Sequence, residues 1–361
     1  MSASAPAEFP QDPPLVAFTR GSWTESQVRG AWAVVDVDGR ILDGEGANEA
    51  SFFARSTLKG LQVLPLLESG AAERFEMREE EVALACASHA GEPQHVAPVL
   101  AFLERLGLGV ADLRCGSQPP TDPDARYALR SAGKFPTAAH NNCSGKHAGF
   151  LALALHLGVP TADYLSTESA SQRLVRDAIR DMTGAGDDEL KCAIDGCSAP
   201  TYRLPLAKLG RAFARLANPD GLPEPRHSAC LRVLEAVAAH PELIAGVHRR
   251  LCTAIGRVTR GRLFPKLGGD AVYVVGERGG DRALAVKLDD GSLRGLDPLV
   301  VELLERLEFV SAEEARGLEQ YRQRELRNWA GTKVGETRVV ARCAKPRRVP
   351  AGGSGARGGG A

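Results

Sequence analysis

Strand-like segments at both ends of the chain, separated by a long helical region, constrain the fold most strongly. Residues 31–46 (AWAVVDVDGRILDGEG) predict two short strands joined at Asp38-Gly39, a dipeptide that favours a tight hairpin turn. Near the other end, residues 271–277 (AVYVVGE) and 283–289 (ALAVKLD) predict two more strands around a glycine-rich turn. We therefore expect an α+β fold, in which one antiparallel sheet is built from both chain ends and carries a mostly helical inserted lobe.

The region between the two sets of strands has helical periodicity, and prolines and glycines mark several helix ends. Pro65 is expected to bend or end a first helix that begins near Ser56. Pro93 suits the first turn of a helix, and Gly158 suits the end of one. The remaining pattern predicts a surface loop at 116–125 and helices near 78–87, 93–109, 144–157, 169–182, 204–217, 228–239, 297–308 and 311–328.

These segments indicate a single domain over residues 15–345. The sheet is expected from about 15–55 and 258–340, and the helical part from about 56–257. Residues 1–14 and 346–361 are expected to be flexible tails, because the last stretch, KPRRVPAGGSGARGGGA, has no apolar content that would order it. The cleft between sheet and helices is the expected position of a functional site.

Charge and hydropathy argue against several classes of partner. Lys plus Arg (45) equals Asp plus Glu (45), and the charges are spread along the chain, so neither a nucleic-acid surface nor an anionic-membrane surface is expected. No run approaches 18 uninterrupted apolar residues, and the first residues, MSASAPAEFPQDPP, lack a basic segment followed by an apolar stretch. We therefore expect a soluble, cytoplasmic protein whose eight cysteines are reduced.

Two serine and lysine motifs suggest nucleophilic chemistry. Ser56 and Lys59 are three residues apart on an expected helix, so a neutral Lys59 amine within reach of Ser56 would be able to take its proton. Alone, this spacing is more often a helix cap followed by a solvated lysine. Ser88 then follows in a loop between two expected helices, and Lys266-Leu-Gly268 opens the later strand region. This order is that of penicillin-recognising serine hydrolases and β-lactamases, which favours a serine hydrolase.

The segment HNNCSGKHAGF, residues 140–150, suggests a metal site beside those motifs. Cys143 and Lys146 fall at the start of an expected helix, where the positive end of the helix dipole favours a thiolate and a neutral amine. Cys197 lies in a second tight loop, and two thiols from separate segments can bind a soft ion such as zinc. Structural cysteines are the alternative, and His89 and His147 fit either a structural role or a role as ligand or base.

Five segments in order, ARSTLKGLQVLP, ACASHAGEPQHV, HNNCSGKHAGF, DGCSAPTYRLPL and HPELIAGVHRRLCT, closely resemble the rhizobial-type L-asparaginases, the thermolabile, inducible asparaginase II family. The resemblance runs from about residue 15 to residue 310. It implies a fold related to glutaminases and serine β-lactamases, a homodimer, and hydrolysis of L-asparagine to L-aspartate and ammonia.

The resemblance also implies roles for individual residues. The family's two serine-lysine pairs fall on Ser56 with Lys59 and on Ser88 with Lys266, and its Zn²⁺ site falls on Cys143, Lys146 and Cys197. Lysine is an unusual metal ligand because it must be neutral. The residues expected to contact the substrate or lie near it are Arg55, His89, Asp195 and Cys252.

The chain departs from the family pattern after the second lysine. The family usually has K-x-G-A-E-G, whereas this chain has Lys266-Leu-Gly-Gly-Asp270-Ala, so substrate preference is open. We hypothesise that Ser56 attacks the side-chain amide with Lys59 as base, that Ser88 and Lys266 relay protons, and that zinc anchors substrate or loops. The alternatives are a related amidohydrolase, a penicillin-interacting serine hydrolase, and an inactive asparagine-binding homologue.

Overall fold

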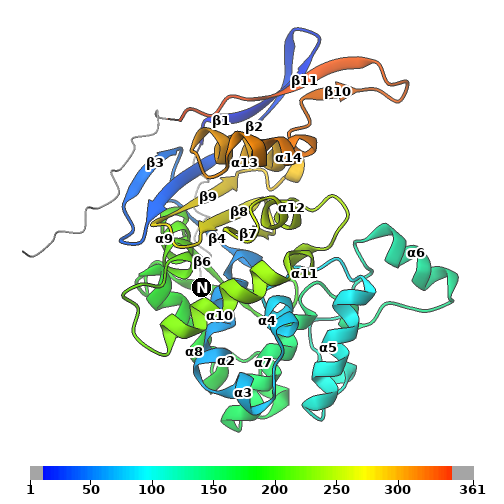
Figure 1. The fold of residues 1–361 in the computed structure, drawn as a ribbon, viewed down its shortest axis with the longest axis vertical. Coiled ribbons are helices and arrows are strands. Elements are labelled where there is room, and N and C mark those ends of the chain that lie inside the picture. Colours follow the sequence, from blue (N-terminus) through cyan, green and yellow to red (C-terminus); the bar gives the residue numbers. More distant parts are fainter. Residues whose placement is uncertain (1–10, 344–361) are drawn as a thin grey trace, which may run out of the picture.

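The computed structural model describes residues 11–343, and an eight-stranded antiparallel sheet joins the two ends of the chain (Figure 1). Its strand order is β10-β11-β1-β2-β9-β8-β7, with β3 paired to β2. The strands are β1 (Pro14–Arg20), β2 (Trp23–Asp36), β3 (Ile41–Glu45), β7 (Leu263–Gly268), β8 (Val272–Glu277), β9 (Arg282–Leu288), β10 (Glu325–Arg327) and β11 (Lys333–Val339). The predicted α+β class and the sheet built from both ends are confirmed, including the hairpin at Asp38-Gly39 between β2 and β3.

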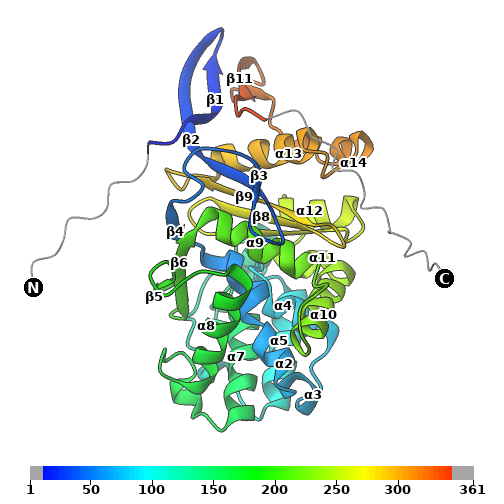
Figure 2. The same cartoon turned by 90° about the vertical axis from the view of Figure 1, so that its left-hand side faces the viewer.

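The centre of this sheet is buried on both faces. Residues 31–36 of β2 are all buried, and Val34 pairs with Leu284 of β9, which joins the two halves of the chain. Figure 2 shows α13 and α14 on one side of these strands and α9 on the other. Helix α9 approaches closely because residue 210 is glycine: a Cβ there would lie 2.7 Å from Cγ2 of Val35. Covering both faces explains why the strand reads AWAVVD rather than alternating between apolar and polar residues.

The helices form the lobe below the sheet and a smaller group above it (Figures 1 and 2). The α-helices are α1 (Lys59–Gln62), α2 (Leu64–Glu68), α3 (Ala71–Arg74), α4 (Glu79–Ala85), α5 (Pro93–Arg105), α6 (Pro123–Ser131), α7 (Ser144–Leu157), α8 (Ala170–Thr183), α9 (Leu206–Ala217), α10 (Arg226–Ala239), α11 (Pro241–Ala245), α12 (Leu251–Val258), α13 (Leu296–Arg306) and α14 (Ala312–Gly317). Short 3-10 helices are η1 (Arg55–Leu58), η2 (Val110–Asp112), η3 (Ala138–His140), η4 (Thr161–Asp163), η5 (Leu293–Gly295) and η6 (Glu319–Tyr321). The predicted starts at Pro93 and Ser144 are confirmed, as is the end at Gly158, which has a φ of 71°.

Three local predictions differ from the structure. A second sheet of order β4 (Ser51–Phe53), β6 (Pro200–Pro205) and β5 (Lys191–Ile194) was not expected, because its strands are short and are held by contacts distant in sequence. The expected loop at 116–125 contains the start of α6, where the Asp122 side chain caps the helix by accepting from Ala125 N. The helix expected at 311–328 ends as α14 at Gly317, and the chain then forms η6 and β10.

Helix α7 forms the centre of the helical lobe. Residues 144–154 are all buried, including Lys146 and His147, as expected for a helix that is apolar on nearly every side. Gly145 allows α7 to cross α4 at close range, since a Cβ there would lie 2.4 Å from the carbonyl oxygen of Leu84. This crossing brings the start of α7 beside the loop that follows α4.

Part of the expected amino-terminal tail is held in place. Asp12 is buried, its side chain accepts a hydrogen bond from Ala47 N at 2.6 Å, and β1 begins at Pro14. The rest of that tail, residues 1–10, and the expected carboxyl-terminal tail at 346–361 lie outside the described residues.

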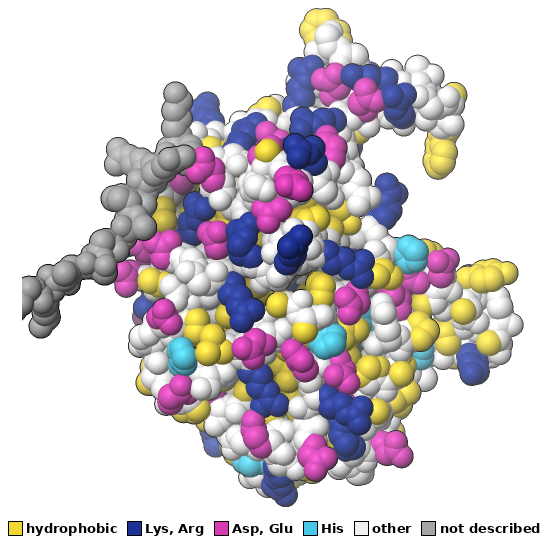
Figure 3. Space-filling view, viewed as in Figure 1, with side chains coloured by type: hydrophobic (Ala, Val, Ile, Leu, Met, Phe, Trp, Pro, Cys, Tyr) yellow, Lys and Arg dark blue, Asp and Glu magenta, His cyan; other side chains and the backbone are white. Residues whose placement is uncertain are grey.

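The surface carries charges of both signs. On the face shown in Figure 3, basic and acidic side chains alternate over the sheet and the helical lobe. Within residues 11–343, no helix combines the length and apolar character that a membrane span requires.

Candidate active site

A cavity of about 780 Å³ lies where the helical lobe meets the sheet. Eight parts of the chain line it: η1, the loop between α4 and α5, the segments at 115–121 and 141–143, the loop between β5 and β6, Arg250, the end of β7 with the turn after it, and the segment at 291–293. It lies in the predicted cleft, and it brings together side chains that are up to 215 residues apart in one hydrogen bond.

Two lysine amines converge on one serine in this cavity. Nζ of Lys266 lies 2.8 Å from Oγ of Ser88, and Nζ of Lys59 lies 3.1 Å from the same oxygen. Both lysines are buried, at 1% and 0% exposed, whereas Ser88 is partly open to the cavity. Within the described residues, no carboxylate forms an ion pair with either lysine. Burial lowers the pKa of Lys266 to about 7, and the positive charge of Lys59 adds to the effect.

Ser56 lines the same cavity, but among the described residues its hydroxyl has no hydrogen bond to the Lys59 amine. The expected contact within the Ser56–Lys59 motif is therefore absent. Lys59 extends inward instead, where its Nζ donates to the carbonyl oxygen of Ala87 and, at 3.3 Å, to that of Asn142. A buried ammonium needs such acceptors. The Ala87 carbonyl directly precedes Ser88, and the Asn142 carbonyl lies just before the start of α7.

Cys143, Lys146 and Cys197 form the second cluster, as the sequence predicts. Lys146 Nζ lies 3.2 Å from Sγ of Cys197, all three side chains are buried, and Cys143 and Cys197 are hydrogen-bonded through their side chains. That hydrogen bond lowers the pKa of Cys143 well below its usual range although burial opposes it, and it raises the pKa of Cys197. Burial opposes the charge of Lys146, but the neighbouring thiols raise its pKa overall.

This cluster fits a soft metal ion only if the lysine amine serves as a ligand. In residues 11–343, no three His, Cys, Asp or Glu side chains are placed to hold a metal ion. Two thiols and one amine nevertheless lie together in one buried group, and sulfur and nitrogen are the donors that zinc prefers.

Arg55 bridges two carboxylates at the cavity. Its Nε lies 2.6 Å from Oδ1 of Asp195, and its Nη1 forms an ion pair with Asp270. Although partial burial opposes the charge, these carboxylates raise the pKa of Arg55. Arg55, Ser198 and Asp270 all line the cavity with left-handed φ angles, of 53°, 68° and 54°. Such backbone costs about 1 kcal/mol or more for each non-glycine residue, and it concentrates at functional sites.

The other predicted residues lie in different positions. His89 lines the cavity, and its Nε2 lies 2.8 Å from Oγ of Ser144; burial lowers its pKa well below the usual range. Cys252 is described by the structure but is not among the residues that line the cavity. Its Sγ lies 3.2 Å from the hydroxyl of Tyr273. His147 is fully buried, with Nδ1 2.7 Å from the hydroxyl of Tyr164, which agrees with the structural alternative.

Other polar residues of the cavity wall were not predicted from the sequence. Gln118 accepts a hydrogen bond from Asn142 N at 3.1 Å, and Arg250 donates to Oγ1 of Thr121. Arg250 lies within the recognised segment HPELIAGVHRRLCT, but two adjacent arginines gave no signal for which one faces a site.

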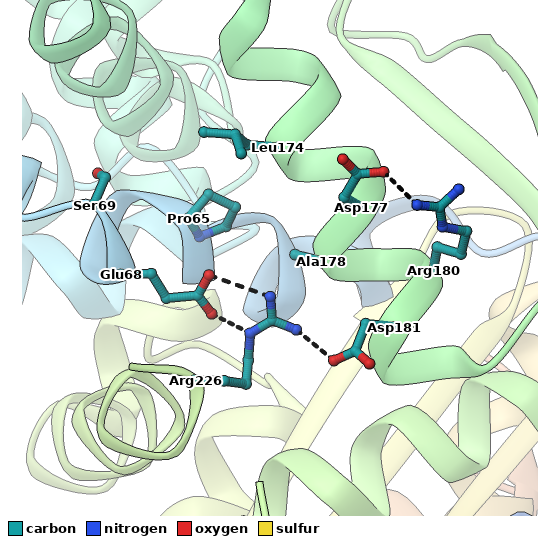
Figure 4. Close-up of a pocket in the computed structure, with 9 residues that line it drawn as sticks. All are labelled: Pro65, Glu68, Ser69, Leu174, Asp177, Ala178, Arg180, Asp181 and Arg226. Carbon is teal, nitrogen blue, oxygen red and sulfur yellow. Dashed lines mark hydrogen bonds and ion pairs between the residues drawn. The ribbon is translucent and has the colours of Figure 1, made fainter. Parts of the chain in front are cut away.

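A second cavity, of about 630 Å³, lies between α2, α8 and α10 (Figure 4). Arg226 pairs there with Glu68 and, at 2.8 Å, with Asp181. Arg180 pairs with Asp177 at 2.9 Å. Every charged side chain of its lining is thus paired with another member of the lining.

Two of the solved structures that match this chain align with it at low similarity. That of Mglu in its native form in the presence of 4.3 M NaCl has 12% identity and a TM-score of 0.40, over 82% of this chain and 60% of that one. That of a β-lactamase from Mycobacterium bovis has 15% identity and a TM-score of 0.38, over 76% of this chain and 93% of that one. The chain therefore spans less than two thirds of the length of Mglu.

No protein with a curated description matches the sequence. The family model of L-asparaginase II, however, matches residues 16–339, which include every residue assigned above to the cavity and the cysteine cluster. On this match the chain belongs to the L-asparaginase II family.

Proposed function

We propose that this protein is an L-asparaginase, which hydrolyses the side-chain amide of L-asparagine to give L-aspartate and ammonia. The observation that carries the proposal is the contact of two buried lysine amines with Ser88 in an open cavity of an L-asparaginase II family member. A lysine with a pKa near 7 is partly neutral at physiological pH, and a neutral amine is a competent base for a serine hydroxyl.

In the proposed mechanism, a serine attacks the amide carbon and forms an ester. The contacts favour Ser88: its Oγ bonds to the amide carbon while Nζ of Lys266 takes the hydroxyl proton. The Lys266 ammonium then returns the proton to the amide nitrogen as the carbon–nitrogen bond breaks, and this nitrogen leaves as ammonia. Water attacks the ester by the reverse use of the same groups, releasing aspartate and restoring Ser88. Lys59 holds Ser88 in place through its bonds to Ser88 and to the Ala87 carbonyl.

Ser56 as the attacking serine, with Lys59 as its base, is the alternative that sequence analysis favours. Ser56 lines the same cavity, so a substrate amide is able to approach either hydroxyl. Because Lys59 is bonded to Ser88 rather than to Ser56, this alternative requires Lys59 to change partners when substrate binds.

Cys143, Lys146 and Cys197 would hold Zn²⁺ in this proposal. When bound, zinc would supply a fixed positive charge beside the cavity that anchors the substrate or the loops. The chain's own contribution is the ordering of two loops, since Cys143 precedes α7 and Cys197 lies between β5 and β6. Metal analysis of the purified protein, and of a Cys197→Ser variant, measures whether these residues bind the ion.

From the family resemblance we also propose that the protein is a homodimer and acts in the cytoplasm. Light scattering of the purified protein measures its mass in solution. A mass of one chain at all concentrations up to those used in assays would contradict the dimer.

The test of function is ammonia release from L-asparagine and, separately, from L-glutamine, for the parent protein and for Ser56→Ala and Ser88→Ala. We expect release from asparagine and a loss of at least about 1,000-fold in kcat/KM for Ser88→Ala. Turnover of Ser88→Ala within a few-fold of the parent would move the attacking role to Ser56. Turnover of nitrocefin in place of asparagine would favour a penicillin-interacting hydrolase, and asparagine binding without release would favour a non-catalytic homologue.

A further inference from the structure

Not every charged side chain that lines the active-site cavity has an ion-pair partner within the described residues. Four charged side chains line it: Arg55, Asp195, Asp270 and Arg250. The first three form one group, in which a single guanidinium contacts two carboxylates. This group has a formal charge of −1, so it repels a further carboxylate and attracts a cation.

Arg250 stands apart from that group. Within the described residues, its side chain donates a hydrogen bond to Oγ1 of Thr121, and no carboxylate forms an ion pair with it. Asp297 is near enough to feel its charge, but no ion pair joins the two. A guanidinium that faces a cavity without an anionic partner is the preferred group for binding a carboxylate, because its parallel N–H groups match the two oxygens.

Hydrogen bonds link the part of the chain just before Arg250 to the loop that carries Ser88, the proposed nucleophile. Ser88 N donates to the carbonyl oxygen of Ile244 at 2.9 Å, and Val247 N donates to Oε1 of Glu92 at 3.1 Å. These bonds fasten the end of α11 and the segment after it to the loop that carries Ser88. Arg250 occupies the N-cap position of α12 without a side-chain capping bond, and the positive end of that helix adds to the attraction for an anion.

We propose that Arg250 is the specificity-determining residue that binds the α-carboxylate of the substrate. The inference rests on the proposed amidase function and adds to it the residue that selects side-chain amides with a free α-carboxylate. In this arrangement the α-carboxylate lies against Arg250, and the α-ammonium lies toward Asp270 and Asp195. The Asp270 side chain is 64% exposed and so is open to such a cation. Arg55, which was expected to contact the substrate or lie near it, holds those two acids in place.

The test compares Arg250→Gln with Arg249→Gln, which removes the same charge from the exposed neighbour outside the described cavity lining. Each variant and the parent are assayed with L-asparagine and with L-asparaginamide, in which the α-carboxylate is replaced by a neutral amide. For Arg250→Gln we expect KM for asparagine to rise about 10- to 100-fold with kcat within three-fold, and kcat/KM for asparaginamide to stay within two-fold. Arg250→Lys should recover part of the loss, and Arg249→Gln should change neither substrate.

An equal loss on both substrates would overturn the proposal, because it is the result of a purely structural role. So would a KM for asparagine within two-fold of the parent. If the parent releases no ammonia from either amide, the proposed function fails, and calorimetric binding of L-aspartate then decides this inference separately. Binding that weakens at least ten-fold in Arg250→Gln but not in Arg249→Gln supports it, and equal or undetectable binding in the parent and both variants overturns it.

Discussion

The two largest cavities described here differ in how their charges are arranged. In the cavity between α2, α8 and α10, each arginine is paired with an acid of the same wall (Figure 4). In the cavity at Ser88, two buried lysines and Arg250 have no carboxylate ion-pair partner within the described residues. Burying charge without a partner is costly, so a fold keeps it only where something else is gained.

This difference separates a structural cavity from a functional one more clearly than volume does. The cavities measure about 630 and 780 Å³, so size alone hardly distinguishes them. The ion pairs of the first cavity join three helices, whereas the cavity at Ser88 contains the groups that we propose as base, nucleophile and anion-binding residue. Variants in each cavity should therefore have opposite effects on activity and stability.

The largest effect is expected for Lys266→Met. It removes the amine that accepts the Ser88 proton and keeps an unbranched chain of similar length in a site that is 1% exposed. We expect kcat/KM for asparagine to fall at least about 1,000-fold with the protein still folded. Ammonia assays and circular dichroism measure the two quantities, with Lys333→Met, on the exposed part of β11, as the matched control. Activity within ten-fold of the parent would remove Lys266 from the mechanism.

The opposite pattern is expected for Arg226→Gln in the paired cavity. This change leaves Glu68 and Asp181 without their shared partner, so the protein should lose about 2 kcal/mol of unfolding free energy. Urea unfolding measures that loss, and kcat/KM should stay within two-fold of the parent. A variant that is fully stable but ten-fold less active would contradict the division between the two cavities.

Activity should also depend on pH through Lys266. The amine acts as a base only when neutral, and its pKa is lowered to about 7, so kcat/KM should fall about ten-fold per pH unit below 7 and level off above it. A pH profile from 5 to 9 measures this, and residual activity of Lys266→Met should lack the step near 7. A flat profile for the parent, or one that declines as pH rises through 7, would be inconsistent with a lysine base.

The smallest effect is expected for Arg180→Gln. Arg180 and Asp177 are each about half exposed, so their ion pair is screened by water and should contribute less than about 0.5 kcal/mol. The comparison with Arg226→Gln in the same urea series shows whether burial, rather than pairing itself, determines the contribution. A loss for Arg180→Gln as large as that for Arg226→Gln would show that it does not.

Much of the fold followed from local patterns in the sequence. The β2–β3 hairpin and helix α7 were predictable because Asp38-Gly39 and Gly158 mark a turn and a helix end directly. Strand β5 and helix α6 were not predictable, because the first depends on pairing with β6 and the second lies in a segment whose composition indicates a loop.

The site was predictable in its residues and less so in its contacts. The family segments indicated Ser88 and the cysteine cluster, and the order of serine and lysine motifs indicated Lys266. The structure places Lys266 against Ser88 and Lys146 against Cys197. The partners of Lys59 and Arg55 could not be read from spacing, because they lie 28 to 83 and 140 to 215 residues away. Burial explains the partners of both side chains, because a charged group that is removed from water must form hydrogen bonds with acceptors that the fold places beside it.

The central claim is that the amide is cleaved through a serine ester, and hydroxylamine partitioning tests it most directly. Hydroxylamine competes with water for such an ester and gives the β-hydroxamate of aspartate. The account predicts the same ratio of hydroxamate to aspartate from L-asparagine and from the β-methyl ester of L-aspartate, since both would form one common intermediate. A ratio that changes with the leaving group would contradict the ester and show that water attacks the bound amide directly.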